Sequence, residues 1–100
     1  MPRFIVRVEL YGGPSWQDYN HLHTAMERRG FVKTITSDKG VVYELPTATY
    51  YRDATVSLSE VLKDAKAAAD GVWTSASAIA METNGISWNG LRPFEKRRLA

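Results

Sequence analysis

The sequence predicts an α+β fold in which two helices lie on one face of an antiparallel β-sheet. Three observations predict it. Residues 3–11 alternate apolar and polar side chains as a half-buried strand does, two segments carry apolar residues at helical spacing behind a serine, and the remaining apolar segments are rich in β-branched and aromatic residues. The predicted order is β-α-β-β-α-β, followed by one additional short strand.

Length and composition are those of one globular domain. The chain has 100 residues, of which 44% are hydrophobic and 24% charged. No stretch approaches the roughly 18 apolar residues of a membrane helix, and the first residues lack the apolar run of a signal peptide. The absence of cysteine excludes disulfides and thiolate catalysis. We therefore expect a cytoplasmic protein that does not contact membranes.

Basic residues gather near the C-terminal end. Thirteen Lys and Arg against eleven Asp and Glu give a net charge of only +2 at pH 7, which excludes a uniformly basic surface. Four basic residues nevertheless fall within the last nine positions, namely Arg92, Lys96, Arg97 and Arg98. We interpret residues 1–91 as a single domain and residues 92–100 as a basic tail, which either neutralises phosphates or is a solvated end.

The first strand is predicted over residues 3–11 and ends before Gly12-Gly13-Pro14. Its apolar face consists of Phe4, Val6, Val8 and Leu10, and its opposite face of Ile5, Arg7, Glu9 and Tyr11. Ser15 is placed to cap a helix over residues 16–29, with Asp18 favourable for the exposed amides and Gly30 just past the end. The stripe expected to face the sheet is Trp16, Tyr19, Leu22 and Met26.

A hairpin is predicted next in the chain. Residues 31–37 and 41–45 favour extended structure, and Asp38-Lys39-Gly40 between them supplies a turn with glycine at the left-handed position. Pro46 should interrupt the hydrogen-bond ladder. Because residues 47–51 again favour extended structure, the second strand is expected to continue past a bend or bulge.

The second helix and the last strands complete the order. Ser57 and Glu60 have the spacing of a capping box, and the inward residues of the helix should be Leu58, Val61, Leu62, Ala65 and Ala69. The later part of residues 72–83 is predicted to be a strand. Asn84-Gly85 indicates a tight hairpin turn, so residues 86–88 should form a short returning strand. Split βαβ units in this order form the ferredoxin-like arrangement, with both helices on one face of the sheet.

Few residues offer catalytic chemistry. His21 and His23 diverge by about 200° on a helix, which disfavours a shared metal site. His23 should lie beside the apolar stripe, partly buried, and His21 on the outer face with Arg28. No Walker, Rossmann or serine hydrolase motif and no convincing carboxylate pair is present. We therefore expect neither a metal nor another cofactor.

The residues present leave metal-independent cleavage of RNA chemically possible. The 2′-hydroxyl is an internal nucleophile, so a protein need supply only a base, an acid and a cation for the phosphorane charge. His21, His23, Arg28 and Arg29 qualify by type, but most small proteins contain such a set.

A binding function is the alternative. The sheet face away from the helices would carry Arg7 and Tyr11, and neighbouring strands would add Lys33 or Tyr43 depending on register. Interleaved aromatic and cationic side chains on an open sheet bind single-stranded RNA in RRM-type domains, although no RNP motif is present. Such a face more often packs against a second subunit, and four further aromatics are sufficient for a dimer interface, namely Tyr50, Tyr51, Trp73 and Trp88.

Several segments of the chain resemble one known family. They are Pro2 to Leu10, Leu22 to Met26 with Gly30-Phe31, Thr34 to Asp38 with Gly40-Val41, Leu45 to Ala48, and Lys63 to Ala69. These segments resemble small bacterial proteins grouped with GhoS, the antitoxin of a type V toxin–antitoxin system. The resemblance extends to about residue 91, excludes the basic tail, and is greatest to members of the family other than its founder.

The resemblance implies a ferredoxin-like fold and a sequence-specific endoribonuclease that cuts the messenger of a membrane-damaging toxin. In the founding antitoxin, arginines occupy the positions of His21 and His23. Arginine supplies a permanent charge, whereas histidine exchanges a proton near neutral pH. The difference implies either a changed mechanism or a loss of cleavage.

The sequence thus leads to two main hypotheses. The first is a metal-independent endoribonuclease of antitoxin type acting on toxin messenger RNA, in which His23 or His21 exchanges the proton and Arg28 with Arg7 holds phosphate. Its predicted contacts to RNA are Arg7, Tyr11 and Lys33. The second is a non-enzymatic homodimer that binds RNA or a protein through the open sheet. An accessory protein that inherited only the fold is a third possibility, and no hypothesis involves DNA or a membrane.

Overall fold

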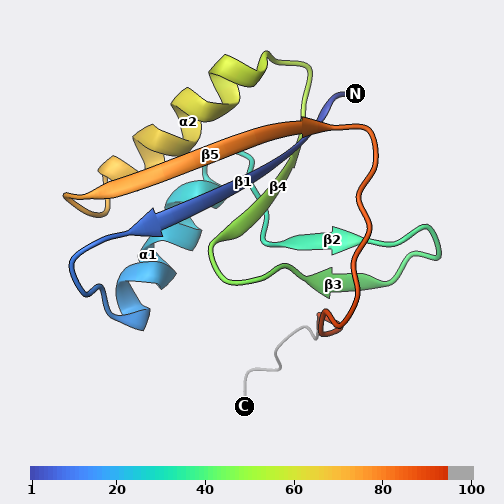
Figure 1. Ribbon diagram of the computed structural model, residues 1–100, viewed down its shortest axis with the longest axis horizontal. Helices are drawn as coiled ribbons and strands as arrows, with labels where there is room; N and C mark the ends of the chain where they lie inside the picture. The colour runs from blue at the N-terminus through green and yellow to red at the C-terminus, as the bar shows by residue number, and fades with distance from the viewer. Residues whose placement is uncertain (95–100) are drawn as a thin grey trace.

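A computed structural model describes residues 1–94 (Figure 1). Within these residues the chain forms two helices and five strands, in the order β1 (Arg3–Leu10), α1 (Trp16–Glu27), β2 (Thr34–Thr36), β3 (Val42–Glu44), β4 (Thr49–Asp53), α2 (Leu58–Asp70) and β5 (Ala76–Thr83). The predicted α+β class is therefore confirmed. Of the predicted basic tail, residues 95–100 lie outside the described residues.

The strands form two antiparallel sheets. In the larger sheet β1 is central, with β4 on one side and β5 on the other. Arg7 of β1 lies opposite Thr49 of β4 and Ile79 of β5, which fixes the register on both sides. The smaller sheet is a ribbon of β2 and β3. A single bridge between Val32 and Tyr51 links the segment before β2 to β4.

Both helices cover the same face of the larger sheet, as Figure 1 shows. The alternation predicted for β1 is confirmed, because Phe4, Val6, Val8 and Leu10 are all buried. The helices complete this core with Leu22, Met26, Val61, Ala65, Ala68 and Ala69. Burial of a large apolar side chain stabilises a fold by about 1.5–3 kcal/mol, so this layer is the main source of stability.

Both predicted helix caps are confirmed. The Ser15 hydroxyl accepts a hydrogen bond from the Asp18 amide at 3.3 Å, and the Asp18 carboxylate accepts one from the Ser15 amide at 2.8 Å. Ser57 and Glu60 form the same reciprocal pair at the start of α2. Each box satisfies two backbone amides that would otherwise lack a partner.

The apolar stripes were predicted less well than the caps. Trp16 is 76% exposed, and Leu58 and Leu62 are 40% and 41% exposed, so their predicted inward positions are wrong. Trp16 is the first residue of α1, and its side chain lies outside the buried core. In α2 the buried stripe is centred on Val61 and the alanines, which leaves the two leucines at its margin.

The predicted interruption at Pro46 is confirmed, but the expectation that the same strand continues past a bend or bulge is wrong. Strands β3 and β4 lie on either side of Pro46 and belong to different sheets. Between them Ala48 adopts a left-handed conformation with φ of 60°, and its carbonyl accepts a hydrogen bond from Val8. In the turn before β3, Gly40 has φ of 84°, which is the left-handed conformation expected there.

The predicted ferredoxin-like strand order is not confirmed, because the strands divide into two sheets. The predicted strand at residues 86–88 is wrong. After β5, the hydroxyl of Thr83 donates to the Gly85 carbonyl, and the side chains of Ile86 and Trp88 line a cavity. The tertiary contacts of this segment, such as the packing of Trp88 on Tyr43, therefore override the turn preference of Asn84-Gly85.

Residues just past the predicted domain end pair with the β2–β3 ribbon. The Glu44 amide donates to the Arg92 carbonyl at 2.9 Å, and the Phe94 amide donates to the Val42 carbonyl at 2.8 Å. Pro93 forms a bridge with Tyr43. The chain after β5 thus crosses the molecule and joins the free edge of β3.

The capping box of α2 gives a stability prediction. Ser57→Ala removes the acceptor for the Glu60 amide and should lower the free energy of unfolding by about 1 kcal/mol. That loss should lower Tm by about 4–8 °C for a chain of this size. Ser59→Ala in the same helical turn, where the serine is exposed, is the matched control. Thermal unfolding followed by circular dichroism measures both, and equal Tm values for the two variants would contradict the capping role.

Candidate functional site

A groove of about 810 Å³ runs between α1 and α2 on the helical side of the molecule. Its polar wall belongs to α1 and comprises His21, Thr24, Arg28 and Arg29. The opposite wall belongs to the C-terminal half of α2 and the residues after it, and it is built of small side chains, namely Ala67, Ala68, Gly71 and Val72. The groove is open to solvent and is large enough for a small ligand or a segment of a polymer.

Helical spacing explains why these α1 residues meet. His21, Thr24 and Arg28 are separated by three and four positions, which places them on one stripe of the helix. The same rotation turns Leu22 and Met26 into the core. The sequence-based placement of His21 and Arg28 on a common outer face is therefore correct.

The charge of the groove is partly compensated at one end. Asp64 of α2 accepts a hydrogen bond from Arg52 at 2.9 Å and lies 3.6 Å from Arg29. Arg52 also lies over the ring of Phe31, 5.1 Å from its centroid. Arg28 forms no ion pair with the carboxylates of residues 1–94. The groove therefore offers an imidazole beside one uncompensated and one partly compensated guanidinium.

His23 lies outside this groove and has a structural partner. Its Nδ1 atom is 2.6 Å from the Tyr50 hydroxyl, and the two rings meet edge to face at 5.7 Å. Partial burial lowers the pKa of His23, the charge of Lys33 acts in the same direction, and Glu27 opposes both. Burial also raises the pKa of Tyr50, so the phenol remains protonated at neutral pH. His23 is thus the partly buried, hydrogen-bonded histidine that its place beside the apolar stripe predicts.

The two histidines do not converge. His21 lines the groove, whereas His23 points toward Tyr50 of β4. Among residues 1–94, no three His, Asp or Glu side chains are grouped closely enough to hold a metal ion. In the same part of the chain, neither helix is long and apolar enough to cross a bilayer.

The predicted RNA contacts do not all lie on the open face of the larger sheet. Arg7 and Tyr11 lie on the open face, where the Tyr11 hydroxyl is 2.8 Å from Ser77 Oγ. Lys33 lies in the segment between α1 and β2, outside the strands, and its charge lowers the pKa of His23. Because the sheet separates Arg7 from Arg28, these two arginines do not reach the same phosphate.

Sequence reasoning missed the partners of the groove. Arg52 and Asp64 are twelve positions apart on a strand and a helix, and they meet only through tertiary packing. No local spacing links them to Arg29. The sequence carries no signal of this contact, because it depends on how α2 lies relative to β4.

The resemblance noted above agrees with a comparison to known families. The chain matches the family described as Endoribonuclease GhoS over residues 1–90. It belongs to the GhoS family. The match covers both helices and all five strands described here and ends four residues before Phe94. No curated protein matches the chain.

This match confirms the predicted kinship. The description of the family names an endoribonuclease activity. The match covers His21, His23 and Arg28, as well as Arg7, Tyr11 and Lys33. It assigns no role to any of them. Their roles are therefore argued below from geometry.

The environment of His23 predicts how stability depends on pH. The imidazole pKa is about 6.5 in an unfolded chain and lower in the folded protein. The unfolded state therefore binds the proton more readily, and the free energy of unfolding falls as pH drops through 6.5 until the folded pKa is passed. His23→Gln should remove this part of the pH dependence. Urea unfolding at pH values from about 8 to about 5 measures it, and equal pH profiles for the two proteins would contradict the prediction.

Proposed function

We propose that this GhoS family member is an endoribonuclease that cleaves single-stranded RNA in the groove between α1 and α2. The observation that supports it is the placement of His21 beside Arg28 and Arg29 in one open groove. The proposed substrate is the messenger of a membrane-damaging toxin, as the resemblance to antitoxins implies. The reaction uses the RNA's own 2′-hydroxyl as nucleophile.

His21 is the proposed general base. It takes the proton of the 2′-hydroxyl as the oxygen attacks the adjacent phosphorus, and the bond from phosphorus to the 5′-oxygen breaks. Water protonates the leaving oxygen, which yields a 2′,3′-cyclic phosphate and a 5′-hydroxyl. Arg28 and Arg29 stabilise the negative charge on the non-bridging oxygens. None of these steps requires a metal ion.

Of the two histidines, His21 is the better candidate for this role. Nδ1 of His23 is occupied by Tyr50, and its imidazole packs against the sheet. Its proposed part is structural. Arg7 and Tyr11 on the open face, together with Lys33, are proposed to hold RNA away from the scissile bond, since none of them lines the groove.

Cleavage of candidate toxin transcripts in excess chelator tests the proposal. His21→Gln should lower kcat by about 100-fold, within the usual range for a general base. Arg28→Ala should also slow cleavage, and a 2′-deoxy substitution at the scissile nucleotide should abolish it. The cyclic phosphate on the 5′ fragment identifies the nucleophile.

Lys63→Ala is the matched control, because Lys63 is an exposed cation on α2 that lies outside the groove. It should cleave at the rate of the unmodified protein. Intact RNA at every protein concentration, or equal rates for His21→Gln and Lys63→Ala, would refute cleavage in this groove.

The open face of the sheet favours a second candidate function, a non-enzymatic homodimer that binds RNA or a protein. Ile79 and Met81 on β5 are 58% and 44% exposed, and β5 is an edge strand of its sheet. Arg7 and Glu9 lie beside them on β1 with opposite charges. A two-fold interface needs a surface that complements itself, and such a pair of charges permits one.

Sedimentation distinguishes this candidate. The chain should sediment as a dimer, and Ile79→Lys should convert it to a monomer because a charge would be buried in the interface. Leu62→Lys, at an exposed leucine on α2, is the matched control and should remain dimeric. A monomeric unmodified protein would exclude this interface.

A further inference from the structure

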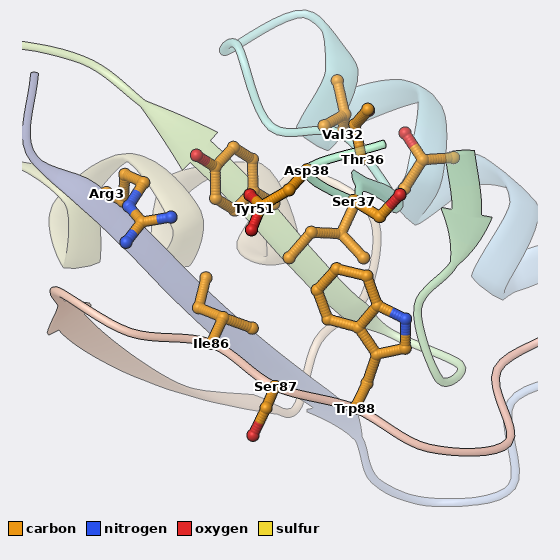
Figure 2. A pocket seen from close by; sticks show the side chains of 11 residues that line it. Arg3, Val32, Thr36, Ser37, Asp38, Tyr51, Ile86, Ser87 and Trp88 are labelled. Carbon is orange, nitrogen blue, oxygen red and sulfur yellow. The ribbon is translucent and has the colours of Figure 1, made fainter. Parts of the chain in front are cut away.

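A second cavity of about 400 Å³ lies on the side of the molecule away from the helices. Arg3 of β1 and Tyr51 of β4 form one side, and Ile86 and Trp88 from the segment after β5 form another. The β2 strand and the turn that follows it close the cavity with Ile35, Ser37 and Asp38. In Figure 2 the Tyr51 ring, the Trp88 indole and the Arg3 guanidinium border the same space.

The aromatic walls are held in place by their neighbours. The indole of Trp88 packs against Tyr43, with ring centroids 5.7 Å apart and planes inclined by 60°. The Tyr51 hydroxyl donates to Asp53 at 3.4 Å. Both rings are only partly buried, so each retains accessible surface. Aromatic rings fixed in this way are the surfaces on which unstacked bases pack.

Arg3 supplies a fixed positive charge at the edge of the cavity. One of its nitrogens donates to the Asn84 carbonyl, which anchors the side chain. A guanidinium has five N–H donors, so others remain free for a ligand. Arg3 forms no ion pair with the carboxylates of residues 1–94. Its charge is therefore available to a phosphate.

We propose that this cavity binds one unstacked nucleotide of RNA. The base packs against Trp88 and Tyr51, its edge meets the polar groups of Ser37 and Asp38, and a phosphate meets Arg3. The volume lies within the roughly 300–1,000 Å³ of small-ligand sites. The inference rests on the proposed function, because RNA cleaved by this protein is the natural source of such a nucleotide.

The cavity and the groove are lined by residues that lie close together in the chain. Arg29 lines the groove and Val32 lines the cavity. These residues are three positions apart, so their Cα atoms are separated by at most about 11 Å. A single strand of a few nucleotides therefore reaches both, and a base held in the cavity sets which phosphate enters the groove.

Nucleotide binding is tested on the full chain without cleavage. Amide and indole resonances of the ¹⁵N-labelled protein are followed during titration with AMP, GMP, CMP and UMP, with ribose 5-phosphate as the probe that lacks a base. At least one nucleotide should shift the Trp88 indole and the amides of Ile35, Ser37 and Tyr51. Ribose 5-phosphate should bind about 10-fold more weakly, which is the usual scale of one stacked base.

Two variants locate the contacts. Trp88→Leu should weaken nucleotide binding about 10-fold, whereas Trp16→Leu, at a tryptophan 76% exposed on α1, should not change it. Because Trp88 also packs against Tyr43, thermal unfolding of Trp88→Leu is measured alongside. Arg3→Gln leaves that packing intact and should weaken binding of the monophosphate but not of the corresponding nucleoside.

The outcomes separate this inference from the proposed cleavage. Nucleotide binding in the cavity by a protein that cleaves no RNA would refute the cleavage proposal and support the cavity. Cleavage of RNA with no shift at these residues would overturn the inference and leave the cleavage proposal standing. Equal affinity for ribose 5-phosphate and for every nucleotide would also overturn it, since the base would then contribute nothing.

Discussion

The structure depends on the two-sided demands placed on β1. One face of this strand must be covered because Phe4, Val6, Val8 and Leu10 are apolar, and both of its edges are paired, to β4 and to β5. Two helices packed against that one face satisfy the first demand. The other face is then left to polar and moderately apolar side chains. Every candidate site follows from this division, because the groove lies between the covering helices and the nucleotide cavity lies on the side that they leave open.

Features that depend on a few neighbouring residues were predictable from the sequence. The capping boxes at Ser15 and Ser57, the alternation of β1 and the left-handed Gly40 each follow from local backbone chemistry, and all are present. Features decided by competition between distant segments were not. The turn preference of Asn84-Gly85 predicted a returning strand, yet Ile86 and Trp88 instead line a cavity whose other walls come from β1, β2 and β4. A local rule has no information about those walls.

The same distinction applies to the candidate sites. His21 and Arg28 were grouped correctly because seven positions make two turns of one helix. The contribution of Asp64, which links Arg29 to the largely buried Arg52, depends on a side-chain contact between α2 and β4 that had no signature in the sequence. Arg7 was paired with Arg28 by charge alone, and the sheet between them shows why charge without topology misassigns partners. Tyr51 and Trp88 were counted as aromatics for an interface, and only the structure brings them to one cavity.

On both proposals the RNA must be single-stranded, and the shape of the molecule gives the reason. The groove and the cavity lie on different faces, and their linings come nearest in the chain at Arg29 and Val32. An A-form duplex keeps its bases paired and stacked, so it can neither place one base between Tyr51 and Trp88 nor turn sharply around an edge. A flexible single strand does both at the cost of unstacking one base. The position of the cavity relative to the groove would then restrict cleavage to unpaired RNA. No separate contact that recognises double-stranded RNA would be needed.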